Sequence, residues 1–196
     1  MQTVTNVSFK KVILASNSPR RKELLKNINI PFEVKVKDTP DETYPNNLTK
    51  TEIPEFLAIK KASFYNDETE QPGTILITAD TIVYCKNRVL GKPENYEEAY
   101  DMLKLLSGKE HEVITGVAIT SKEKQIVFNS VTRVFFKELT NNEIDYYIQT
   151  FKPYDKAGAY GIQEWIGMVG IEKIDGSYYN VVGLPVQKLY SELMRY

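Results

Sequence analysis

A short apolar run that leads directly into the start of a helix is the strongest constraint in this sequence. It lies within residues 11–25 (KVILASNSPRRKELL). Residues 12–15 are too few for a helix face and are typical of a strand buried on both sides. Residues 16–18 favour a turn, and Pro19 suits the first helical position with Ser18 as its N-cap. The pattern predicts a buried strand followed at once by a helix N-terminus.

The first turn of this helix carries two arginines, Arg20 and Arg21. Free backbone N–H groups and the helix dipole already make a helix start electropositive. Two further cations at this position are unfavourable next to the dipole, and their presence makes sense only if an anion lies nearby. One interpretation is therefore a site for a phosphate-bearing ligand. The other is a solvated helix start whose arginines pair with acids elsewhere, and this short motif alone does not decide between them.

The charge balance argues against nucleic-acid and membrane partners. The chain has 196 residues, with 25 Lys and Arg against 26 Asp and Glu, and a net charge of −1. No global field attracts nucleic acid or an anionic membrane, so any anion site must be local.

The single cysteine, Cys85, excludes an intramolecular disulfide and fits a reducing compartment. Since no apolar run reaches membrane-spanning length, we expect a cytoplasmic protein.

One carboxylate stands inside the most apolar stretch. Residues 74–85 (TILITADTIVYC) indicate a second buried strand with Asp80 in its middle. An ionised carboxylate among apolar neighbours is costly unless it is paired, hydrogen-bonded or metal-bound. Asp80 is therefore the strongest single-residue indication of a functional site. The alternative is a carboxylate satisfied by backbone amides at a bulge.

Other acidic and basic candidates lie in a loop and on a predicted helix. Asp41 and Glu42 are either solvated acids or groups that hold a metal. Lys60 and Lys61 either extend past the core to solvent or point into a site. The sequence pattern alone leaves both questions open.

Two glycine-flanked segments provide further candidates. Lys92 stands between a glycine and a proline and is well placed to reach a phosphate, although such tripeptides are common in loops. Gln163 ends the segment 155–163 and offers both a donor and an acceptor, which suits the reading of a base edge. The alternative is a simple glycine-bearing turn.

Periodicity and capping residues predict the other elements. We expect strands near residues 32–36, 89–90, 113–119, 125–136, 169–174 and 178–182. We expect helices that begin near Glu52, Asn95 and Thr140, and a last helix over residues 184–193. His111 has no second histidine or cysteine with which to share a metal, so we expect it to be structural or exposed.

Six short motifs, in this order, resemble the Maf family, the septum-formation-associated nucleoside triphosphate pyrophosphatases. They are residues 16–21 (SNSPRR), 79–83 (ADTIV), 91–93 (GKP), 106–108 (LSG), 155–163 (DKAGAYGIQ) and 182–185 (VGLP). Each motif is weak alone, but the six together are highly specific, and the match to the family covers essentially the whole chain. The resemblance implies a single domain over residues 1–196 with an α/β fold. It also implies a mixed, bent sheet, two lobes around a central cleft as in the inosine triphosphate pyrophosphatases, and a homodimer.

The resemblance also implies an activity. One branch of the family has the patterns SxSPRR, ADT and GIQ, and Arg20, Thr81 and Gln163 match that branch. The branch hydrolyses dTTP and UTP to the monophosphate and pyrophosphate with a divalent cation, Mg²⁺ or Mn²⁺. The sequence does not distinguish canonical from modified pyrimidine triphosphates as the physiological substrate.

The family's site positions fall on named residues of this chain. Asp80 is implied as the general base, and Lys61 is preferred to Lys60 because residues 57–62 (LAIKKA) fit the family pattern. The implied residues are Ser16, Arg21, Lys61 and Lys92 for phosphate, Glu42 and Asp80 for the metal, and Arg20, Thr81 and Gln163 for substrate specificity.

Two other classes of function remain. A nucleotide-binding regulator of cell division would keep the cationic residues and show no turnover. A single-stranded nucleic-acid binder is disfavoured because there is no basic stripe with interleaved aromatic residues. Asp80 favours the enzyme, since mere binding of a triphosphate gains nothing from a further negative charge without a metal.

Overall fold

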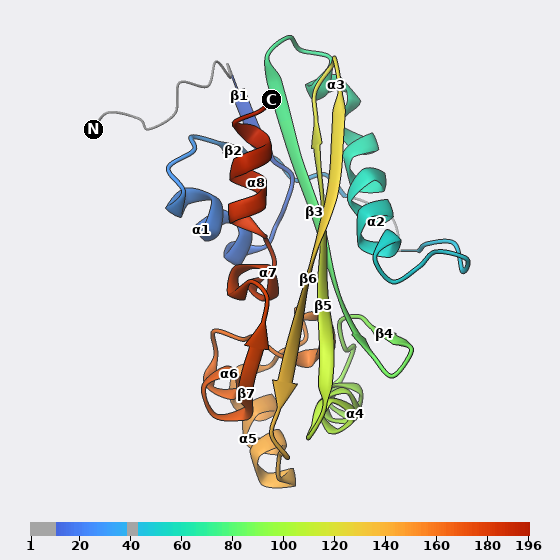
Figure 1. The fold of residues 1–196 in the computed structure, drawn as a ribbon, viewed down its shortest axis with the longest axis vertical. Coiled ribbons are helices and arrows are strands. Elements are labelled where there is room, and N and C mark those ends of the chain that lie inside the picture. Colours follow the sequence, from blue (N-terminus) through green and yellow to red (C-terminus); the bar gives the residue numbers. More distant parts are fainter. Residues whose placement is uncertain (1–10, 39–42) are drawn as a thin grey trace. The chain divides into compact units, whose positions relative to one another are not determined.

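The chain forms a mixed α/β fold around one β-sheet, as the sequence predicts (Figure 1). A computed structural model describes residues 11–38 and 43–196. The strands follow the order β2-β1-β3-β5-β6-β7, and β4 pairs with β3. The chain divides into two compact units. Among the described residues, the first unit holds 11–38, 43–80, 115–130 and 183–196, and the second holds 81–114 and 131–182.

The strands are β1 (Lys11–Leu14), β2 (Glu33–Val34), β3 (Thr74–Cys85), β4 (Arg88–Leu90), β5 (Glu110–Thr120), β6 (Gln125–Phe136) and β7 (Ile171–Asp175). The α-helices are α1 (Pro19–Asn27), α2 (Glu52–Ala62), α3 (Asn66–Thr69), α4 (Tyr96–Leu106), α5 (Asn141–Phe151), α6 (Trp165–Gly170), α7 (Tyr178–Val182) and α8 (Val186–Leu193). Two short 3₁₀ helices are η1 (Ser63–Tyr65) and η2 (Ala157–Ala159).

The strand, turn and helix predicted at the start of the chain are confirmed in the first unit. Strand β1 pairs in parallel with both β2 and β3. Residues 12–14 are buried, as expected for a strand covered on both sides. Helix α1 begins at Pro19, and the Ser18 side chain accepts the backbone N–H of Arg21 as an N-cap.

Helix α2 lies directly on the sheet of the first unit (Figure 1). A Cβ placed on Gly116 of β5 would lie 2.3 Å from the carbonyl carbon of Pro54, so only glycine allows the helix backbone this close. On β3, the Thr78 hydroxyl donates to the carbonyl of Ala58 at 2.7 Å. These two contacts fix where α2 lies relative to β3 and β5.

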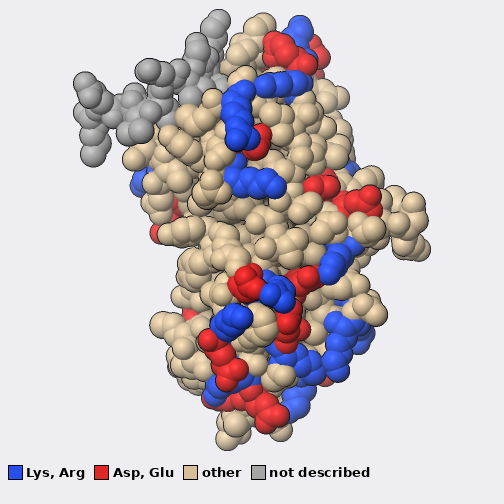
Figure 2. Space-filling view, in the orientation of Figure 1, with Lys and Arg blue, Asp and Glu red and all other residues tan. Residues whose placement is uncertain are grey.

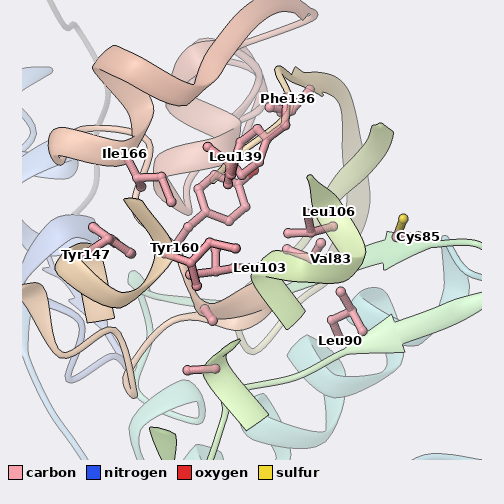
Figure 3. Packing of buried hydrophobic residues seen from close by; sticks show 14 of the residues in the cluster. Val83, Cys85, Leu90, Leu103, Leu106, Phe136, Leu139, Tyr147, Tyr160 and Ile166 are labelled. Atoms are coloured by element: carbon pink, nitrogen blue, oxygen red, sulfur yellow. The ribbon is translucent and has the colours of Figure 1, made fainter. Parts of the chain in front are cut away.

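The second unit has its own apolar core (Figure 3). Leu103 and Leu106 of α4 pack in one cluster with Tyr147 of α5, Val83 of β3 and Phe136 of β6. Burial of side chains of this size contributes roughly 1.5–3 kcal/mol each to stability. This core supports the two glycine-flanked segments that the sequence singles out.

Two helix starts in the second unit are confirmed from their capping residues. The side chain of Asn95 accepts the backbone N–H of Glu98 at the start of α4. Thr140 and Glu143 form a reciprocal capping box at the start of α5. These interactions span three residues, so the local sequence is enough to predict them.

The predicted strand over residues 178–182 is wrong, because these residues form helix α7. The Asn180 side chain is fully buried, and its amide donates to the carbonyl of Val113 and the hydroxyl of Thr132, both at 3.0 Å. The Asn180 backbone N–H also donates to the Ser177 hydroxyl at 3.4 Å. Hydrogen bonds to distant residues thus override the strand preference of a tyrosine- and valine-rich segment.

The predicted strand over residues 32–36 is largely wrong, since β2 has only two residues. Its apolar side chains do not form a buried face, because Val34 and Val36 are exposed. The backbone N–H of Lys37 instead donates to the Tyr65 hydroxyl at 2.8 Å, and the Lys37 ammonium pairs with Glu68 at 2.9 Å. A lysine therefore anchors this segment.

Acidic and basic side chains are interspersed on the face shown in Figure 2, in agreement with a net charge of −1. Within residues 11–38 and 43–196, no helix is both long and apolar enough to span a membrane.

Candidate functional site

The turn before α1 is closed by its own side chains. Ser16 is buried, and its hydroxyl accepts the backbone N–H of Ser18 at 3.2 Å. The Ser18 hydroxyl in turn accepts the N–H of Arg21 at 3.4 Å. Serine hydroxyls at a turn offer such local bonds in place of ladder bonds, which is why the strand ends here.

Arg21 connects three parts of the first unit that are distant in sequence. Its Nε donates to the carbonyl of Gly183 at 2.8 Å, and a terminal nitrogen donates to the carbonyl of Ala79 at 2.9 Å. The guanidinium of α1 is thereby held beside β3, one residue before Asp80. Arg20, its neighbour, is half-buried.

Asp80 and Lys61 form an ion pair in the first unit. Asp80 is 6% exposed, and the Lys61 side chain is 18% exposed. Alternation along β3 directs Thr78 and Asp80 to the same face, while helical spacing brings Ala58 and Lys61 to the same face of α2. The bond from Thr78 to Ala58 therefore sets the distance at which Lys61 reaches the carboxylate. Lys61 provides the compensating charge that a buried Asp80 requires.

Lys60 takes a different direction from Lys61. Its ammonium donates to the carbonyl of Thr43 at 3.0 Å and to the Thr43 hydroxyl at 3.1 Å. Of the two lysines weighed in the sequence, Lys61 is thus the one that contacts Asp80. Asp41 and Glu42 lie outside the described residues, so their roles stay predictions.

The described residues offer a partial set of donors for a metal. No group of three His, Cys, Asp or Glu residues placed to hold a metal ion occurs within 11–38 and 43–196. Mg²⁺, however, is usually bound through one or two carboxylates together with substrate phosphates and water. A buried carboxylate such as Asp80 has the hard oxygen chemistry that Mg²⁺ and Mn²⁺ prefer. The residues present therefore fit a metal that is shared with a triphosphate.

In the second unit, the Lys92 and Gln163 segments are joined by their backbones. The N–H of Gly158 donates to the carbonyl of Gly91 at 3.0 Å. Gly158 has a φ of +68°, and a Cβ there would lie 2.9 Å from Val83. Glycine is required for both reasons. The exposed side chains of Lys92 and Gln163 thus come from two loops held together on β3.

Gln163 lines a pocket of about 460 Å³ within the second unit. Two of the apolar side chains in its wall are unusually accessible, with Met168 74% exposed and Tyr178 41% exposed. The size falls in the range of small-molecule sites, which combine apolar walls with a few polar groups. The remaining lining residues are Ile162, Gly167, Ile171, Glu172, Lys173 and Ile174.

The predicted site residues fall into two sets, one in each unit. The first unit holds Ser16, Arg20, Arg21, Lys61 and Asp80, and the second holds Thr81, Lys92 and Gln163. Thr81 directly follows Asp80 on β3 and is half-buried.

Sequence reasoning missed the residues that position these groups, above all Thr78, Tyr147 and Glu164. Tyr147 donates its hydroxyl hydrogen to Glu164, the residue after Gln163. Burial, and then this hydrogen bond, raise the pKa of Tyr147, so the hydroxyl stays protonated. The available signal was an acid directly before the apolar pair Trp165 and Ile166, although it is weaker than the signal at Asp80 because Gln163 precedes it.

A family model described as Maf-like protein matches residues 11–196. The chain belongs to the Maf family. A Phocaeicola vulgatus protein named dTTP/UTP pyrophosphatase is 54% identical over 190 residues, covering 97% of this chain and 98% of that protein. A Parabacteroides distasonis protein of the same name is 52% identical over 191 residues, with 97% and 98% coverage. The Staphylococcus aureus Ham1 structure is 14% identical, with a TM-score of 0.41 over 65% of this chain and 72% of that chain.

Proposed function

We propose that this member of the Maf family hydrolyses dTTP and UTP to the nucleoside monophosphate and pyrophosphate. The observation that carries the proposal is the buried ion pair between Asp80 and Lys61. Maf relatives that match nearly the whole chain are named dTTP/UTP pyrophosphatase, which supports the same substrates here. A protein that only binds nucleotides has no need of a buried carboxylate among cations.

Asp80 acts as the general base in this proposal. It accepts a proton from a water molecule whose oxygen attacks the α-phosphorus. The bond from the α-phosphorus to the oxygen that bridges to the β-phosphate breaks, and pyrophosphate leaves. Burial on β3 and the pairing with Lys61 hold the carboxylate in one place, which such proton transfer requires.

Cations neutralise the charge that builds up on the phosphates. We assign this role to Arg21, Lys61 and Lys92, with the Ser16 turn as a further contact. Two guanidinium donors of Arg21 are directed at backbone carbonyls, which supports a second role in fixing the backbone before Asp80. Arg21 therefore contributes both position and charge.

A divalent cation, Mg²⁺ or Mn²⁺, would be held by Asp80 and Glu42 together with the phosphates. When bound, it would supply additional neutralisation of the phosphate oxygens. The metal changes neither assignment: Asp80 is the proton acceptor, and Lys61 provides positive charge beside the phosphates. The Glu42 part of this assignment is a prediction from the family resemblance.

Gln163 reads the base, together with Arg20 and Thr81. Its amide can meet the N3–H donor and a carbonyl acceptor of thymine or uracil at once. The pocket at Gln163 supports this assignment, because its apolar and aromatic walls suit a pyrimidine ring. A homodimer and a single domain remain predictions from the family resemblance, and a cytoplasmic location remains a prediction from composition and hydropathy.

The test is pyrophosphate release from a panel of canonical and modified nucleoside triphosphates with Mg²⁺ or Mn²⁺. We expect dTTP and UTP to be preferred over CTP and the purine triphosphates. The near-isosteric change Asp80→Asn should lower kcat by about 10²-fold to 10⁴-fold, the usual range for a general base, while nucleotide binding survives.

A matched control separates this effect from the loss of a buried ion pair. Glu68 is 8% exposed and pairs with Lys37 in the same unit. Glu68→Gln should leave kcat near that of the wild type. Near-normal dTTP turnover by a folded Asp80→Asn protein would show that Asp80 is not the base. Nucleotide binding without turnover by the wild type would favour the regulator instead.

A further inference from the structure

The loop that carries Gln163 is held by a group of polar side chains to which the proposed chemistry assigns no role. Glu164 is the N-cap residue of α6, yet its carboxylate makes no capping hydrogen bond. It turns back instead, where one oxygen accepts the hydroxyl hydrogen of Tyr147. The other oxygen lies 3.1 Å from the ammonium of Lys156. The Glu164 carboxylate thus joins α5 to the start of the loop.

The same group of side chains binds the loop backbone. The Tyr147 hydroxyl accepts the N–H of Gly161 at 3.0 Å. A Cβ on Gly161 would lie 2.9 Å from the carboxyl carbon of Glu164, so the carboxylate lies directly against this backbone. A Cβ on Gly167 would lie 1.8 Å from the carbonyl oxygen of Ile162. The two residues before Gln163 are therefore both in close contact with neighbouring groups.

Burial distinguishes this group from an ordinary surface ion pair. Tyr147 is fully buried, Lys156 is 8% exposed, and the Glu164 side chain is 19% exposed. Buried polar networks that are fully hydrogen-bonded make the structure around them rigid. Lys156 is also held by Asp155, at 2.6 Å. The Gln163 side chain, in contrast, is exposed. A fixed backbone thus carries a side chain that is accessible to a ligand.

We propose that Glu164 is a positioning residue for base selection, which acts through Tyr147 and Lys156 to fix the backbone that presents the Gln163 amide. The proposal rests on the proposed function for the nature of the ligand, a pyrimidine nucleotide. If the glutamine amide flips, its donor and acceptor exchange places and it can hydrogen-bond to cytosine as well as to uracil. Selectivity therefore requires the amide to be held in one orientation. Polar groups fixed in place reject the wrong base far better than shape alone.

Two variants weaken the network in different places. Glu164→Gln removes the charge that pairs with Lys156 and keeps the shape, and Tyr147→Phe removes only the hydroxyl. The matched control is Tyr96→Phe, because the Tyr96 hydroxyl also donates to a carboxylate, that of Asp145, in the same unit.

The measurement is binding, so that it does not depend on turnover. Calorimetry gives dissociation constants for the α,β-imido analogues of dUTP and dCTP, and for inorganic tripolyphosphate, which has no base. We expect Glu164→Gln and Tyr147→Phe to reduce the preference for the dUTP analogue by about tenfold, since small displacements of a positioned group have effects of this size or larger. Tripolyphosphate affinity should be unchanged, and Tyr96→Phe should behave as the wild type.

An unchanged ratio of the two nucleotide affinities in Glu164→Gln and Tyr147→Phe would overturn the proposal. So would equal weakening of all three ligands, which is the result of general structural damage. A wild type without preference between the two analogues would overturn it as well. If Glu164→Gln does not fold, the ratio for Tyr147→Phe decides. A wild type that prefers the dUTP analogue but releases no pyrophosphate would refute the proposed hydrolysis. The binding data for the two variants would then still decide whether Glu164 positions Gln163.

Discussion

The single histidine of the chain should make the second unit sensitive to mild acid. His111 is 2% exposed, and its Nε2 lies 2.8 Å from the hydroxyl of Tyr160. Its ring also meets Phe136 edge-on, at 5.1 Å between centroids. Its Nδ1 has no hydrogen-bond partner among the described residues. Burial lowers the pKa of His111 from its ordinary 6.5 to about 3, because a charged imidazolium would lose its hydration here.

The depressed pKa gives the direction and size of the effect. The unfolded chain binds a proton at His111 below pH 6.5 and the folded chain does not, so this contribution to stability is present above pH 6.5 and falls as the pH falls. Between pH 7 and pH 5.5 the loss is about 1.3 kcal/mol. Other side chains with ordinary pKa values do not titrate in this window. With a urea m-value of about 2 kcal/mol/M, the midpoint should fall by about 0.6 M.

Trp165 provides the assay, because it is the only tryptophan and belongs to the same unit as His111. Urea unfolding is followed by its fluorescence at several pH values from 7 to 5.5. The control is His111→Gln, which retains a hydrogen-bonding group near Tyr160 and cannot titrate. This variant should be less stable at neutral pH, but its stability should not change across the window. A wild-type midpoint that stays constant, or the same slope in the variant, would refute the reasoning.

Three further predictions concern other residues. Arg21→Ala and Lys92→Ala should each lower kcat/KM for every accepted triphosphate by a similar factor; the loss of one pyrimidine substrate with another spared would contradict a role in phosphate binding. Gln163→Leu should reduce the preference for dTTP over GTP by about tenfold or more and slow the residual chemistry less, as the ratio of kcat/KM values will show. Gly116→Ala should destabilise the protein by about 1–3 kcal/mol in urea unfolding, since its Cβ meets the backbone of Pro54.

Local signals in the sequence predict most of the elements correctly. The limits of β3 and β6 follow from runs of apolar or alternating residues. The starts of α4 and α5 follow from capping pairs only three residues apart. Each of these depends on neighbours within one turn or one strand, which a single sequence contains in full.

The failures depend on distant partners. Helix α7 forms because the Asn180 side chain donates hydrogen bonds to Val113 and Thr132. Both partners lie far away in the sequence, so the local segment alone does not reveal them. In the site, the energetic cost of burying Asp80 predicts that this carboxylate has a partner. Only the position of α2 on β3 shows that the partner is Lys61. One of the two carbonyls that Arg21 binds lies 162 positions further along the chain, at Gly183.

The discontinuity of the first unit has a consequence during synthesis on the ribosome. Translation proceeds from the N-terminus, so both segments of the second unit are made before residues 183–196 emerge. Until then Arg21 lacks the Gly183 carbonyl, and α8 has not been made. In the nascent chain, β1, α1 and β3 therefore belong to an incomplete unit after every segment of the second unit has been made. Such long-range closure is slow and leaves apolar surface open to misassembly. Emergence of residues 183–196 is thus the event that allows the unit containing Asp80 and Lys61 to reach its final form.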